Sequence, residues 1–214
     1  MTDKLLASIE VRYPLQEQDV GEFSTLKAGG MTFSIRAFHA KGLGHVSVMK
    51  ASGFLGLMKM DTLMIVPNRV DLPLYSYDRI YAMGNDTLIV ELYDTLTQAV
   101  DLSLMERAKE DFDFLPERDP GKHWYDDIKL SSSISKKAKK ASSAKMDALT
   151  LAHFEAYLSA QAPAVTDALC KADRSAAYVN GLLEQGGPST DVFKKALGEE
   201  KTAKLFRTVL FGIG

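Results

Sequence analysis

The sequence predicts an α+β fold in which an antiparallel sheet carries helices on its faces. Alternating, β-rich segments are concentrated in residues 31–96, and amphipathic helical segments follow in the second half of the chain. Consecutive strand segments are joined by short turns, and strands do not alternate with helices, which disfavours a doubly wound parallel sheet. A chain of 214 residues is long enough for one domain with a sizeable core, so residues 1–214 are expected to form a single unit.

Strand patterns account for most of the first half. The alternating stretch 31–40 comes first, and turn residues at Ser52-Gly53 end the next strand. Gly84-Asn85 predicts a hairpin between the last two strands. Five strands joined in this way form a meander, and they are expected over residues 31–40, 45–52, 55–66, 70–82 and 86–96.

Helical patterns begin at residues 101–115. Residues 128–146 then contain six lysines and no acid, and this Lys/Ser-rich segment is expected to be an exposed, mobile loop. The C-terminal helices, 146–212, start with a helix that is broken at Pro163.

Glycines divide the remaining helical sequence. The Gly186-Gly187 pair is expected to end the second C-terminal helix. Ser189 or Thr190 is expected to cap the third helix, which Gly198 interrupts.

Composition excludes several classes of function. The net charge is −2 and 25% of the residues are charged, so no overall positive field favours nucleic acid. A single cysteine cannot form an internal disulfide, which gives no sign of an oxidising compartment. The N-terminus does not resemble a signal peptide, and no apolar run reaches the roughly 18 residues of a membrane span. The sequence therefore predicts a cytoplasmic protein without membrane contact.

Metal and nucleotide motifs are not apparent. His39, His45, His123 and His153 are scattered, without the spacing of metal ligands, and each is interpreted as an ordinary surface or core residue. Nucleophile-elbow and phosphate-loop motifs are also missing from the sequence. Cys170 lies between apolar neighbours in a helical segment, which favours a packed thiol. No bound metal or cofactor is expected.

Asp78 is the most informative single residue. In "VDLPLYSYDRIYA" (70–82), alternation places Asp78 in the row of Leu74, Ser76 and Ile80, where it is the only charge. A carboxylate on an apolar strand face loses hydration, so its pKa should rise. It is then either a hydrogen-bonded structural group or a proton donor ready near neutral pH.

The lysine run at 129–145 also has two interpretations. It is either a solvated linker or a docking patch that steers an acidic partner. Aromatic residues do not interleave with the lysines, so stacking on nucleic-acid bases is disfavoured.

Three stretches resemble the ferredoxin-dependent bilin reductase family, which includes the red chlorophyll catabolite reductase branch. They are "MIVPNRVDLPLYSYDRIYAMGNDTLIVELYD" (64–94), "HWYDDIKLSSSISKK" (123–137) and "FKKALGEEKTAKLFRTVLFGI" (193–213). They lie in the family's order, and with the strand at 31–40 the resemblance covers residues 31–213. It implies an α/β/α sandwich, a central antiparallel sheet flanked by helices, in a monomer that binds a linear tetrapyrrole between the sheet and the C-terminal helices.

The same resemblance implies site residues and an electron donor. Electrons would arrive singly from reduced ferredoxin or flavodoxin, with ferredoxin docking at the 129–145 lysine cluster, and Asp78 would be the catalytic proton donor. Thr62 falls where some members carry a His. The Glu of the same members falls at Met49, or at Lys50 after a one-residue slip, and the second acid of other members falls at Gly186 or Gly187. Lys136 falls near the cation that binds the propionates. The expected substrate-binding set is Thr62, Met49, Ser76, Lys136 and Phe206.

Three functions remain open from the sequence. The leading hypothesis is ferredoxin-dependent reduction of a biliverdin-like tetrapyrrole, with protonation from Asp78. The second is a non-catalytic tetrapyrrole- or haem-binding protein on the same fold. The third is an unrelated interaction protein, which would have the space between sheet and C-terminal helices filled by side chains.

Overall fold

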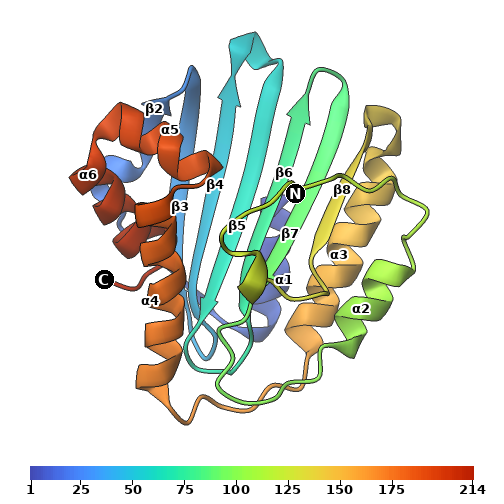
Figure 1. Cartoon of the computed structure of the whole chain (residues 1–214), viewed down its shortest axis with the longest axis vertical. Helices are drawn as coiled ribbons and strands as arrows, with labels where there is room; N and C mark the ends of the chain where they lie inside the picture. The colour runs from blue at the N-terminus through green and yellow to red at the C-terminus, as the bar shows by residue number, and fades with distance from the viewer.

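A single antiparallel sheet forms the centre of the molecule, with helices on both faces (Figure 1). The computed structural model describes residues 1–214, apart from the side chain of Pro188. The strand order is β1-β3-β4-β5-β6-β7-β8, and β2 also pairs with β3. The strands are β1 (Leu15–Gln18), β2 (Thr25–Ala28), β3 (Met31–Ala40), β4 (Gly44–Gly53), β5 (Met58–Pro67), β6 (Leu74–Ala82), β7 (Asn85–Tyr93) and β8 (Ile134–Lys139).

The predicted α+β fold and its meander are confirmed, because β3 to β8 are neighbours in chain order and every pairing is antiparallel. The β6–β7 hairpin turns at Met83-Gly84, one residue earlier than the predicted Gly84-Asn85. Both turn residues have positive φ (50° and 74°), as a two-residue hairpin that follows the strand twist requires.

Helices cover the two faces with different parts of the chain. One face packs against α1 (Thr2–Arg12), α2 (Ser103–Glu110) and α3 (Ser143–Ser159). The other packs against α4 (Ala168–Gln185), α5 (Pro188–Leu197), and α6 (Glu199–Lys204) with the π-helical turn Leu205–Leu210 that continues it. The α/β/α sandwich is therefore confirmed. Successive residues of β6 point to opposite faces of the sheet, so this strand contributes to two separate cores. Tyr75 and Tyr77 pack in the core beneath α3, and Leu74 packs in the core beneath α4.

The prediction of an exposed loop over 128–146 is wrong. Residues Ile134–Lys139 form the edge strand β8, and α3 already starts at Ser143. Ile134, Lys136 and Ala138 alternate inward, and the many lysines conceal this period in the sequence. Lys136 is 1% exposed because its ammonium donates to the Leu115 backbone oxygen (3.1 Å) and to the Glu117 carboxylate (2.5 Å).

Glycines position the C-terminal helices largely as predicted. Gly186 ends α4 with φ 85°, and Gly198 separates α5 from α6 with φ 81°. The expected cap at Ser189 or Thr190 is wrong, because Gly187 is the N-cap and Pro188 is the first helical residue of α5.

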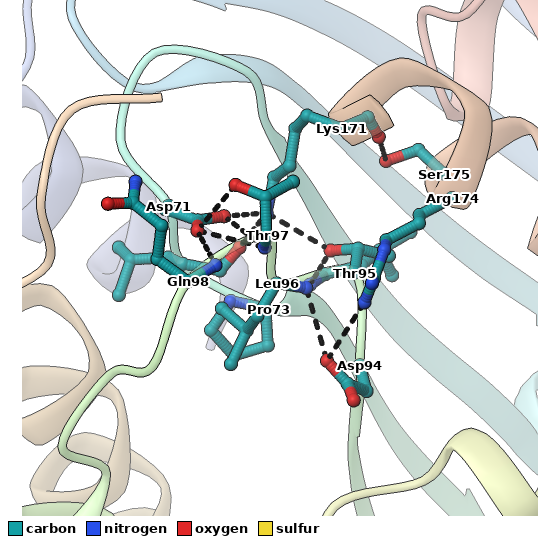
Figure 2. Close-up of polar contacts among 12 residues, drawn as sticks. Asp71, Pro73, Asp94, Thr95, Leu96, Thr97, Gln98, Lys171, Arg174 and Ser175 are labelled. Atoms are coloured by element: carbon teal, nitrogen blue, oxygen red, sulfur yellow. Dashed lines mark hydrogen bonds and ion pairs between the residues drawn. The ribbon is translucent and has the colours of Figure 1, made fainter. Parts of the chain in front are cut away.

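A buried ion pair fixes α4 to the sheet (Figure 2). The Lys171 ammonium on α4 donates to the Asp71 carboxylate (3.0 Å) and to the Leu72 backbone oxygen (2.6 Å), and both charged side chains are at most 1% exposed. Asp71 also accepts hydrogen bonds from Thr97 and Gln98, which follow β7. Burial opposes ionisation of Asp71, but these hydrogen bonds outweigh it and lower the pKa of the carboxyl. The helix that covers one face of the sheet is thus tied to both the β5–β6 connection and the end of β7.

Candidate functional site

A cavity of about 190 Å³ lies between the sheet and the C-terminal helices, and it is partly open to solvent. Its floor consists of side chains from β4 to β7, and α4 contributes Tyr178 and Leu182 to its wall. Phe206 lines it from the π-helical turn, and His123 and Tyr125 line it from the segment between α2 and β8. The surroundings are largely apolar, as is usual for small-molecule sites.

Sheet register brings the residues of the cavity floor together. Met49, Thr62, Asp78 and Ile89 are direct partners across β4, β5, β6 and β7, and direct partners in an antiparallel sheet point to the same face. Ser76 lies on the same face two residues before Asp78. The structure therefore places five of the expected residues in one cavity: Met49, Thr62, Ser76, Asp78 and Phe206. Their role in binding or catalysis stays a prediction.

Asp78 has the electrostatic character of an acid that titrates near neutral pH. Burial raises the pKa of its carboxyl to about 6, since protein surrounds it on all sides except the cavity. The Thr62 hydroxyl donates a hydrogen bond to Asp78 Oδ1 (2.5 Å), which stabilises the carboxylate and limits the rise in pKa. The nearby charge of Glu91 raises the pKa further.

The structure places Lys136 outside this cavity, which corrects the expectation that it lies with the other substrate-binding residues. It pairs with Leu88 on β7, on the sheet face that packs against α2 and α3, whereas Asp78 faces α4. The cavity's cation is instead Arg118, whose guanidinium also donates to the Ser135 hydroxyl (3.3 Å).

The lysines of 129–145 lie in different environments and not together on one exposed loop. Lys136 is buried, and Lys129 pairs with Asp126 (2.6 Å) in the segment before β8. Lys137, Lys139 and Lys140 remain exposed at the sheet edge.

Several lining residues were not identified from the sequence. Glu91 and Tyr93 lie on β7, where the Tyr93 hydroxyl donates to Glu91 Oε2 (2.6 Å). Trp124 lies between the lining residues His123 and Tyr125 in sequence but does not itself line the cavity. It packs directly on the α4 backbone at Gly181, where a Cβ would lie 2.3 Å from the indole ring, and its Nε1 donates to the Gly186 oxygen (3.1 Å). The indole thereby holds the His123–Tyr125 segment against α4.

Fold and cavity together define a class: an antiparallel α/β/α sandwich with a largely apolar, acid-bearing cavity between the sheet and the helices. No family model matches the chain, and no curated protein matches it. Among solved structures it is similar to phytochromobilin synthase from tomato, in complex with biliverdin, with a TM-score of 0.78 at 15% identity. The match covers 99% of this chain and 82% of the tomato chain. At this identity the likeness shows the fold.

Across the described residues, no helix is both long and apolar enough to cross a bilayer.

Proposed function

We propose that this protein reduces a linear tetrapyrrole of the biliverdin type, using single electrons from reduced ferredoxin or flavodoxin. The observation that carries the proposal is the position of Asp78, a carboxyl with a pKa near 6 on the floor of an apolar cavity. The likeness in fold to a synthase crystallised with biliverdin supports the choice of substrate class. The cavity itself argues against an interaction protein with a filled interior.

Asp78 would protonate the bound tetrapyrrole. Reduction of one double bond requires two electrons and two protons, and electrons that arrive singly make the negatively charged, half-reduced pigment more basic. An acid with a pKa near the working pH is suited to transfer a proton at that moment. Thr62 would hold the carboxyl in place through its hydrogen bond, and it would stabilise the carboxylate left after transfer.

The remaining lining residues would bind and orient the substrate. Met49 and Phe206 offer apolar contacts to the pyrrole rings, and Ser76 offers a hydroxyl beside Asp78. Arg118 would pair with a propionate, because its planar guanidinium matches a carboxylate in a bidentate arrangement.

The electron donor would dock through charge complementarity. Ferredoxins are acidic, and exposed lysines at this edge of the sheet would attract such a surface. They are Lys137 and Lys139 on β8, Lys140 directly after it, and Lys145 in the first turn of α3. Steering of this kind weakens as salt concentration rises, so reduction rates should fall with ionic strength.

Biliverdin binding and turnover test the proposal. Purified protein is titrated with biliverdin while the visible spectrum and the fluorescence of the single tryptophan, Trp124, are followed. A reduced ferredoxin system is then added without oxygen. We expect saturable binding, quenching and loss of the biliverdin band, with Asp78→Asn binding but turning over slowly. Binding without turnover would favour a non-catalytic carrier, and absence of binding would refute the proposal for this substrate.

A further inference from the structure

Four large apolar side chains are exposed at the tips of two neighbouring hairpins, where β4 meets β5 and where β6 meets β7. Leu55 is fully exposed, and Phe54, Leu57 and Met83 are each more than half exposed. Both tips project from the same end of the sheet (Figure 1). They share one hollow, which Leu57 lines from the first hairpin and Met83 from the second. We call these four residues the tip patch, because they form one surface instead of single, scattered exposures.

The backbone of the tips is unfavourable for these side chains. Phe54, Leu55 and Met83 have φ values of 53°, 57° and 50°, and in the part of the chain that the structure describes no other residue except glycine has positive φ. Positive φ at a hairpin tip is typical of Gly, Asn and Asp, and it is unusual for bulky apolar residues. Outliers of this kind cluster at functional sites, which indicates that the exposed side chains serve a contact outside the chain.

Lysines flank the tip patch. Lys59 and Lys140 line the hollow between the tips, and among the described residues that line it none is an acid. The Lys140 backbone N–H donates to the Gly84 oxygen (3.1 Å), which holds this lysine beside the second tip. Because the whole chain has a net charge of −2, this positive region is local. It would attract a negatively charged surface.

An anionic lipid surface matches this combination of apolar tips and lysines. Apolar side chains insert at the level of the lipid headgroups, while neighbouring lysines are attracted by negatively charged lipids. A stable protein interface buries roughly 800 Å² on each partner. The tip patch consists of only four side chains on two hairpin tips, which favours the lipid surface over a protein partner.

We propose that the tip patch, together with Lys59 and Lys140, docks the protein on membranes that contain anionic lipids. The contact is peripheral and needs no spanning segment. It departs from the expectation of no membrane contact, which considered only spans and leader segments. Docking would hold the cavity close to the lipid surface, because Met60 and Ile80, which line the cavity, pair with each other on β5 and β6 close to the tips. The proposal does not depend on the proposed reductase function.

Vesicle flotation with the whole chain tests the docking. Vesicles of phosphatidylcholine alone are compared with vesicles that also contain phosphatidylglycerol. We expect the protein to float with the anionic vesicles only, and less of it to float at high salt. Leu55→Asp should weaken this binding at least about 10-fold, the scale of burying one leucine side chain. Lys59→Gln should weaken it about 5-fold, and Lys59 is not among the lysines assigned to the electron donor.

Val11→Asp is the matched control, because Val11 is also an exposed apolar residue but lies on α1. This variant should float as the wild type does. Urea unfolding should show that Leu55→Asp is at least as stable as the wild type, since the Leu55 side chain is fully exposed and Asp adopts positive φ more readily than Leu. Weaker flotation of Leu55→Asp would then report a lost contact and not a lost fold.

Equal flotation of Leu55→Asp and the wild type would overturn the proposal, as would failure of the wild type to float with either kind of vesicle. Self-association of the wild type that Leu55→Asp abolishes, without any flotation, would instead assign the tip patch to a second copy of the chain. Binding of purified ferredoxin that Leu55→Asp weakens, again without flotation, would assign the tip patch to an acidic protein. None of these measurements involves biliverdin, so their outcome is independent of the proposed function.

Discussion

Replacing Asp78 by Asn should stabilise the folded protein at neutral pH, although it removes the proposed proton donor. The carboxyl has a pKa of about 6 in the folded state and an ordinary value of 3.8. The folded state therefore binds more protons than the unfolded state between about pH 4 and 6, and stability falls as the pH rises through this window. Asn resembles the protonated acid and can still accept the hydrogen bond from Thr62.

The magnitude follows from the size of the pKa shift. A shift of roughly two units at 1.36 kcal/mol per unit gives about 3 kcal/mol, and water in the cavity reduces this to about 1–3 kcal/mol. Urea unfolding at pH 4 and pH 7.5 gives the free energy of unfolding of both proteins. Asp78→Asn should match the wild type at pH 4 and exceed it at pH 7.5. A difference that is independent of pH, or a less stable variant at pH 7.5, would refute the reasoning.

Three further substitutions test other parts of the account. Lys171→Met should lower the free energy of unfolding by about 3–5 kcal/mol in urea titrations, because it leaves the charge of Asp71 buried without its cation, and a second change, Asp71→Asn, should recover part of the loss. Thr62→Val should raise the pKa of Asp78 above its present value in an NMR titration, since it removes a hydrogen bond to the carboxylate; a lowered pKa would contradict this. Arg118→Gln should weaken binding of biliverdin about 10-fold in a spectroscopic titration, the equivalent of roughly 1.4 kcal/mol, but should leave binding of its dimethyl ester nearly unchanged. Equal losses for both ligands would mean that Arg118 does not bind a propionate.

Local patterns were sufficient for the central part of the fold. The strand over 31–40 was predicted with its observed bounds, since its alternation is strong, and Gly186 and Gly198 end helices because they adopt positive φ. The edge strand β8 was missed since its inward-facing Lys136 looks like a solvent-exposed charge until Glu117, 19 residues away, is placed beside it. The short strands β1 and β2 also depend on pairing with β3, which no local pattern reveals.

The candidate site was only partly accessible from the sequence. Asp78 was identifiable because it is a lone charge in an apolar row, and Thr62 joins it through strand pairing. Glu91 could have been found, since pairing across either hairpin register places it on the face of Asp78. Arg118 could not, because it lies in an irregular segment whose path over the cavity is determined by tertiary packing.

The visible spectrum of bound biliverdin as a function of pH tests the central claim most directly. If Asp78 transfers a proton to the pigment in the cavity, the wild-type spectrum should change with a clear midpoint as the pH is varied. The change should be lost or displaced by at least one pH unit in Asp78→Asn, with affinity nearly unchanged. The same midpoint in both proteins would contradict the claim that Asp78 is the proton donor.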